Sequence, residues 1–198
     1  MRRNVFLLLS AVAMLVSCYP DGAETYQDMD IVYTNYDEKF DFVSKGTYSL
    51  PDKIVKITGN LAAGELPEYV NEPYNTQILN RIESNMTALG WTKVDAANDP
   101  DLALLPASWT NTTVYYWSDY WCWYYYYYCG WGWYYPTVST VTTGTLVLSL
   151  VAAGEEYIDP SIVWVGAANG VLSGSYNTSR VNDAIDQAFE QSPYLNTK

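Results

Sequence analysis

Residues 145–150 read Thr-Leu-Val-Leu-Ser-Leu. Leucine at positions 146, 148 and 150 alternates with Thr145, Val147 and Ser149, and a period of two residues is typical of a half-buried β-strand. A polar connection covers residues 154–160, and residues 162–167 form a second apolar run. The two runs are therefore expected to pair as an antiparallel hairpin, with Trp164 in the core on the same face as Ile162.

A helix is predicted upstream of this hairpin. Asn71 is a suitable N-cap, Pro73 falls in the first turn, and Gly90 can follow the last turn. Apolar residues recur at helical spacing between these ends, at Ile78, Leu79, Ile82, Met86 and Leu89. The preceding residues 59–73 contain two glycines and two prolines and are expected to form a loop.

A second helix is predicted downstream, over residues 178–191, with Asn177 or Thr178 as its cap. Its apolar face consists of Val181, Ile185, Ala188 and Phe189. Further strands are expected over residues 29–35, 46–50 and 91–94 and from Leu102 onward. This order predicts an α+β fold, a two-layer arrangement in which two helices pack on one face of a mostly antiparallel sheet.

The N-terminus has the features of an export signal. Arg2 and Arg3 precede an apolar run over residues 5–16, which is shorter than the roughly 17–25 residues of a membrane-spanning helix. The run ends in Leu15-Val16-Ser17-Cys18, which resembles a bacterial lipobox. Cleavage before Cys18 would remove residues 1–17 and leave Cys18 lipidated, with residues 18–27 as the lipidated Cys and tether. Three acyl chains make a permanent anchor. By resemblance to enterobacterial sorting, a residue other than Asp after Cys18, here Tyr19, favours the outer membrane.

The composition excludes several function classes. The chain has 22 acidic and 10 basic residues, a net charge of −12, which argues against binding to nucleic acid. It contains no histidine, so His-based triads and His-ligated zinc sites are excluded. The sequence predicts no cofactor and no metal.

Aromatic residues are concentrated in one place. The chain contains 20 Tyr, 8 Trp and 4 Phe, and 15 of these aromatic residues fall between Tyr115 and Tyr135. We call residues 115–135 the aromatic segment. A continuous run of aromatics would line both faces of a strand, and it carries more apolar surface than an ordinary monomer exposes. The binding candidates in it are Trp117, Tyr120, Trp121, Trp123, Tyr125, Tyr127, Trp131 and Trp133.

Four interpretations of the aromatic segment remain open. It could pack on itself within the core, stack on carbohydrate, or dock onto a protein or another copy of the chain. It could also insert at the level of the lipid headgroups, where Trp and Tyr are favoured. The net negative charge of the protein argues against insertion beside anionic lipids.

Two cysteines besides Cys18 lie within the aromatic segment, Cys122 and Cys129. An even number of remaining cysteines in an exported protein favours a disulfide. Two free thiols, or a metal or redox pair, are the alternatives, although this spacing does not match redox or zinc motifs.

The acidic residues show no catalytic pattern. Asp95, Asp99 and Asp101 resemble a sparse cation loop without the glycine and terminal Glu of an EF-hand, and a solvated acidic turn explains them more simply. Ser108, Ser139 and Ser149 have no histidine base. The protein is therefore expected not to be an enzyme.

Five short motifs follow one another along the chain. They are Gly90-Trp91, Asp99-Pro100-Asp101-Leu102, Gly144-Thr145-Leu146-Val147, Val163-Trp164-Val165-Gly166 and Ser192-Pro193. This order resembles the bacterial lipoprotein family called domain of unknown function 4136, over about residues 25 to 195. The resemblance implies an α+β envelope lipoprotein and brings no activity, since the family has no assigned role. Ala152 and Val165 stand where members often carry an acid and an Arg.

The sequence thus favours a lipid-anchored, non-catalytic domain at residues 28–195, carrying the aromatic segment as an insertion. The expected partners are the membrane, through Cys18, and an envelope glycan or protein. A structural component that self-associates as a homo-oligomer through the aromatic segment is the alternative, and a carboxylate-type hydrolase is a weaker one.

Overall fold

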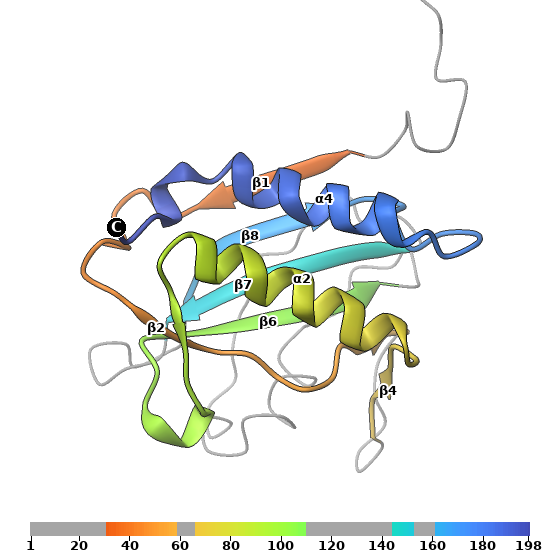
Figure 1. Ribbon diagram of the computed structural model, residues 1–198, viewed down its shortest axis with the longest axis horizontal. Helices are drawn as coiled ribbons and strands as arrows, with labels where there is room; N and C mark the ends of the chain where they lie inside the picture. Colours follow the sequence, from red (N-terminus) through yellow and green to blue (C-terminus); the bar gives the residue numbers. More distant parts are fainter. Residues whose placement is uncertain (1–30, 59–65, 110–143, 153–160) are drawn as a thin grey trace, which may run out of the picture.

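The computed structural model describes residues 31–58, 66–109, 144–152 and 161–198, which form a mixed, open sheet with two helices on one face (Figure 1). The strands are β1 (Val32–Tyr36), β2 (Thr47–Ser49), β3 (Val55–Ile57), β4 (Glu68–Tyr69), β5 (Thr92–Lys93), β6 (Leu102–Trp109), β7 (Thr145–Ala152) and β8 (Ser161–Ala168). The helices are α2 (Tyr74–Ala88) and α4 (Thr178–Glu190), with short 3-10 turns η2 (Ala96–Asn98) and η3 (Pro193–Leu195). The predicted α+β class is confirmed. In these ranges no helix is long and apolar enough to cross a bilayer.

The sheet has the strand order β1-β8-β7-β6-β2-β5, with β3 also beside β6 and β4 beside β3. The four longest strands, β1, β8, β7 and β6, pair antiparallel, which confirms the predicted hairpin of β7 and β8. The short strands β2 and β3 both run parallel to β6, and β5 runs parallel to β2. The sheet is therefore antiparallel on one side of β6 and mainly parallel on the other.

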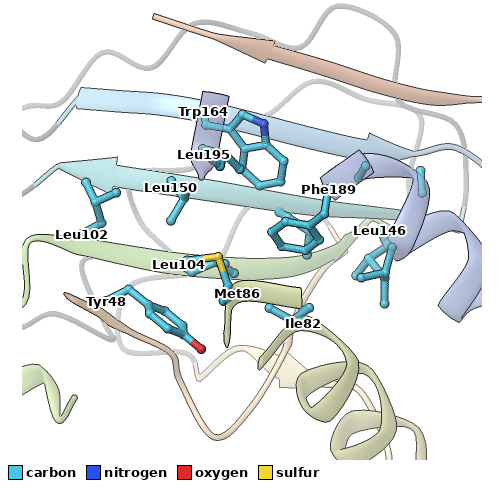
Figure 2. Packing of buried hydrophobic residues seen from close by; sticks show 14 of the residues in the cluster. Tyr48, Ile82, Met86, Leu102, Leu104, Leu146, Leu150, Trp164, Phe189 and Leu195 are labelled. Carbon is cyan, nitrogen blue, oxygen red and sulfur yellow. The ribbon is translucent and has the colours of Figure 1, made fainter. Parts of the chain in front are cut away.

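The main core lies between the sheet and the two helices. Ile78, Ile82 and Met86 of α2 are buried in it, and Leu79 and Leu89 pack against it, as the predicted stripe requires. The predicted face of α4 is buried as well, at Val181, Ile185, Ala188 and Phe189. In Figure 2 the Met86 side chain lies near Tyr48 and Leu104, between α2 and the sheet. Helical periodicity therefore predicted both contacts with the sheet.

The prediction that β7 is half-buried is wrong, because all eight of its residues are buried. Val147 and Val151, which alternate with its leucines, belong to a second apolar cluster on the opposite face of the sheet, to which no residue of α2 or α4 contributes. This cluster comprises Val55, Ile57, Ala103, Leu105, Ala107, Trp109, Val147, Val151 and Ala167. The central strands are thus apolar on both faces.

A register shift separates Trp164 from Ile162. Leu150 pairs with Trp164 whereas Val151 pairs with Ile162, so β8 is irregular at this point. Trp164 is fully buried in the main core, as predicted, but Ile162 packs against the second cluster. The prediction that they share a face is wrong because an extra residue in a strand reverses the alternation beyond it.

The helix ends agree with the sequence at three of four positions. Asn177 caps α4 by accepting a hydrogen bond from Arg180 N (3.2 Å). Both helices end close to the predicted residues. Gly90 follows α2 with φ +99°, as predicted. The N-cap of α2 was predicted wrongly, since Pro73 rather than Asn71 holds that position and makes no side-chain cap. Glu72 instead accepts a hydrogen bond from Thr76 N (3.3 Å).

Candidate functional site

The residues that the sequence favoured for function lie outside the described ranges. These are Cys18, Cys122, Cys129 and the eight aromatic candidates Trp117, Tyr120, Trp121, Trp123, Tyr125, Tyr127, Trp131 and Trp133. The structure does describe the two points at which the chain leaves for the aromatic segment and returns from it. These points are Trp109, the last residue of β6, and Gly144, which precedes β7.

The two ends of this connection are held together. Gly144 N donates a hydrogen bond to Trp109 O (2.7 Å), and Trp109 pairs with Thr145 in the ladder between β6 and β7. Both strands are buried along their whole length. Residues 110–143 therefore begin and end at one point on the most buried part of the sheet.

Gly144 fits this position because of its backbone and its surroundings. It has φ +81°, which disfavours L-residues with a side chain. A Cβ atom here would lie 2.6 Å from Ser173 N and would also meet Ser173 Oγ. Leu172 N donates a hydrogen bond to Gly144 O (2.8 Å), so the turn after β8 packs directly against this point.

Arg180 holds that turn in place. Its guanidinium donates hydrogen bonds to Gly170 O (3.0 Å) and Ser173 O (3.4 Å). The first turn of α4 is thereby tied to the turn that contacts Gly144. A positively charged donor on two carbonyl oxygens stabilises such a turn more than a neutral donor would.

A polar cleft of about 690 Å³ lies elsewhere, between the C-terminal half of α2 and the β2–β5 edge of the sheet. Lys93 Nζ and Glu83 Oε2 form an ion pair across it at 2.7 Å, with both side chains roughly two-fifths exposed. A pair this exposed contributes little to stability. The lining residues are Ser49, Leu50, Asp52, Glu83, Lys93, Val94, Asp95 and Ala96.

Tyr48 lies close to this cleft but does not line it. Its side chain is fully buried, and its hydroxyl has no hydrogen-bond partner among the described residues. Burial raises the pKa of the phenol, and the negative charge of Glu83 raises it further, so Tyr48 stays protonated. The cleft thus offers charged groups that could bind a polar ligand. The described ranges contain no group of three or more acidic or cysteine residues that could hold a metal.

A family model for a domain of unknown function, DUF4136, matches residues 32–194. The chain belongs to the DUF4136 family. A crystal structure of a DUF4136 family protein from Bacteroides thetaiotaomicron is similar to it, with 31% identity and a TM-score of 0.64 over 85% of this chain and 98% of that one. The resemblance inferred from the motifs is therefore confirmed.

More distant structures also resemble this DUF4136 chain. PelC from Paraburkholderia phytofirmans, solved as a dodecamer, has 11% identity and a TM-score of 0.43, with 86% of this chain and 99% of that one covered. A PelC variant in another crystal form, also a dodecamer, gives a TM-score of 0.44 at the same identity, over 86% of this chain and 100% of that one. No curated protein matches the chain in sequence.

The motifs of the DUF4136 domain have structural roles. Trp91 Nε1 donates a hydrogen bond to Leu195 O (2.7 Å), and Trp164 Nε1 donates one to Ser192 Oγ (2.9 Å). Both indoles are buried, and together they attach the segment after α4 to the core. The conspicuous tryptophans of these motifs therefore stabilise the fold.

Asp101 is another structural residue of the DUF4136 domain, so its prediction as part of a solvated turn is wrong. Its Oδ2 accepts hydrogen bonds from Gly46 N (3.0 Å), Thr47 N (2.9 Å) and Thr47 Oγ1 (2.7 Å). Burial opposes ionisation of Asp101, but these hydrogen bonds outweigh it and lower the pKa of the carboxyl. Asp95 has a local role, accepting a hydrogen bond from Ala97 N (2.8 Å) at the start of η2.

Proposed function

We propose that this protein is a non-catalytic envelope lipoprotein, anchored through Cys18, whose aromatic segment contacts a glycan or a protein of the envelope. The observation that supports it most is the anchoring of residues 110–143 at the Trp109–Gly144 hydrogen bond. The two strands that carry the ends of this connection are buried along their whole length and form a rigid support. Rigid support lowers the entropy lost on binding.

The kind of side chain supports a contact surface. Tyr and Trp combine a large apolar ring with a polar tip, and each loses little conformational entropy when it is buried against a partner. Both residues are enriched where proteins bind partners. Fifteen such aromatic residues in residues 115–135 carry more apolar surface than an ordinary monomer exposes.

The anchor is supported by the sequence. Export of the chain, cleavage before Cys18 and acylation of Cys18 would place the domain in the envelope, at the outer membrane. A glycan is then an abundant neighbour, and stacking on aromatic rings is the chemistry by which the segment would bind it.

Self-association through the aromatic segment is the second candidate function. It uses the same surface and the same chemistry, with another copy of the chain as the partner. A carboxylate-type hydrolase is the weakest alternative. It would have to use the acids around the polar cleft, Asp52, Glu83 and Asp95, one of which is already paired with Lys93.

The test replaces residues 116–134 with a short Gly-Ser loop. A matched variant keeps the length and changes the eight aromatic candidates to Ser. We expect both variants to fold, as judged by circular dichroism, and both to lose binding to isolated envelope glycans or to an envelope-protein fraction. Sedimentation velocity measures self-association in parallel. Folded variants that bind as the native chain does would contradict the proposal, whereas a loss of oligomer alone would favour self-association.

A further inference from the structure

Ile31 and Trp109 are distant in the sequence but lie at the same end of the sheet. Asn169 N donates a hydrogen bond to Ile31 O (3.0 Å), and Thr145 Oγ1 donates one to Asn169 Oδ1 (3.1 Å). Thr145 in turn pairs with Trp109. Neighbouring strands lie about 4.8 Å apart, so Ile31 and Trp109 stand about 14 Å apart across three strand spacings. We call this the Ile31 end of the sheet; Figure 1 shows it at the right, where β1 begins and β6 ends.

The Ile31 end also carries most of the exposed large apolar side chains of the described ranges. Ile31 is 64% exposed and Tyr33 is 51% exposed at the start of β1. Leu66, 64% exposed, precedes β4, and the pairing of β4 with β3 and of β3 with β6 places it beyond the level of Trp109. Tyr74, the first residue of α2, is 38% exposed and stacks on Tyr176 in the turn after β8 (3.8 Å between ring centroids).

The opposite end has less apolar surface. Val43 is 71% exposed in the connection from β1 to β2, and Tyr36 is 37% exposed but stacks on Tyr194 (3.6 Å between ring centroids). The C-terminus also lies at this end (Figure 1). The two ends are separated by the length of β6, eight residues or about 26 Å.

The residues that follow Cys18 reach the described domain at the Ile31 end. The residues from Cys18 to Ile31 span at most about 45 Å when fully extended and about 20 Å as a coil. A coil of that length is shorter than the sheet, so it holds the Ile31 end near the lipid and leaves the Val43 end farther away.

We infer that the Ile31 end faces the lipid bilayer and that Ile31, Tyr33, Leu66 and Tyr74 contact its headgroup layer. This inference rests on the proposed anchor at Cys18. Four partly exposed side chains bind a bilayer weakly by themselves, but tethering raises their effective concentration at the surface and makes weak contacts sufficient. Tyr is favoured at the level of the headgroups.

The test uses the lipidated full chain in vesicles of the zwitterionic phosphatidylcholine that contain a lipid with a nitroxide on its headgroup. A fluorophore is attached to Leu66→Cys or to the matched control Val43→Cys, in a chain where Cys122 and Cys129 are both Ser. Both side chains are more than half exposed, so both substitutions leave the core intact. We expect fluorescence at position 66 to be quenched several-fold more than at position 43.

The outcomes separate this inference from the anchor. Quenching at position 43 that equals or exceeds that at position 66, in protein that floats with the vesicles, overturns the orientation alone. Protein that does not float with the vesicles overturns the anchor at Cys18 and the orientation with it.

Discussion

Arg81 of α2 and Asp186 of α4 join the two helices through a bidentate ion pair. Arg81 Nε donates to Asp186 Oδ1 (2.6 Å), and Arg81 Nη2 donates to the other carboxylate oxygen. Asn85 Nδ2 also donates to Asp186 Oδ1 (2.8 Å). A planar fork of donors on one carboxylate sets the relative position of the two helices as well as stabilising their contact.

Replacing Asp186 with Asn is expected to lower the free energy of unfolding by about 1 kcal/mol at neutral pH, because the charge-assisted hydrogen bonds are lost in a partly exposed site. Thermal unfolding followed by circular dichroism measures this. Asp183→Asn is the control, since Asp183 lies on the same helix and its carboxylate accepts a hydrogen bond from the exposed Ser179. An equal loss in both variants would contradict the assigned role of the pair.

Acid should remove the same stabilisation. Burial opposes ionisation of Asp186, but hydrogen bonds from Arg81 and Asn85 outweigh it, so the folded-state pKa lies below the ordinary value of 3.8. Ionised Asp186 therefore contributes its full stabilisation at pH values above 3.8. That stabilisation is lost as the pH falls through the lower pKa of Asp186 in the folded state. Urea unfolding between pH 7 and pH 2 should therefore show a steeper acid loss for the native chain than for Asp186→Asn. Parallel curves would refute this linkage.

Replacing Asp101 with Asn is expected to lower the free energy of unfolding by about 1–2 kcal/mol, since one carboxylate oxygen accepts three hydrogen bonds from Gly46 and Thr47. Urea denaturation measures it. Asp99→Asn is a close control, because Asp99 is exposed and has φ +52°, a conformation that Asn tolerates. Asp99→Asn should be nearly neutral, and a neutral Asp101→Asn would be the contrary result.

Replacing Gly144 with Ala should destabilise the domain by more than about 2 kcal/mol, through the cost of a positive φ plus the clash with Ser173. Gly174→Ala separates the two effects, because Gly174 also has a positive φ, +71°, but has nothing within 4 Å of an added Cβ. It should cost only about 1 kcal/mol. Thermal unfolding compares the two variants, and equal costs would exclude the clash.

Cys122 and Cys129 are expected to form a disulfide, which would close a short loop and contribute about 2.5 kcal/mol on the chain-entropy model. A thiol reagent applied to the unfolded, unreduced protein should then modify neither residue, whereas prior reduction should expose both. Two modified cysteines without reduction would disprove the disulfide.

The helices and the long strands could be predicted because their signals are local. The stripe from Ile78 to Met86 repeats every turn and marks the side of α2 that is buried. The alternation around Leu148 likewise defines a strand and one of its faces. By contrast, β3 and β4 are three and two residues long, too short for a period to appear, and β4 falls within the predicted loop over residues 59–73.

The burial of the second face could not be predicted from β7 alone. In a half-buried strand Val147, which alternates with the leucines, would face solvent, yet it joins Leu105 and Ile57 in one cluster. Small or β-branched apolar residues occur on either side of a sheet, so their side is decided by which strands lie beside them. The hydrogen bonds of Asp101 could not be predicted either, because its partners Gly46 and Thr47 are distant in sequence.

The sequence by itself determined the α+β class, the two helices and their buried faces, the β7–β8 hairpin and the family, because each depends on periodicity or on short motifs. Only the tertiary structure decided that Ile31 and Trp109 stand at the same end of the sheet, since that depends on β1 pairing with β8 across more than a hundred residues. Pairing between distant strands leaves no local period in the sequence. Helices, strands and short motifs can therefore be predicted from neighbouring residues, whereas which residues share one end of the sheet is decided only when distant strands pair.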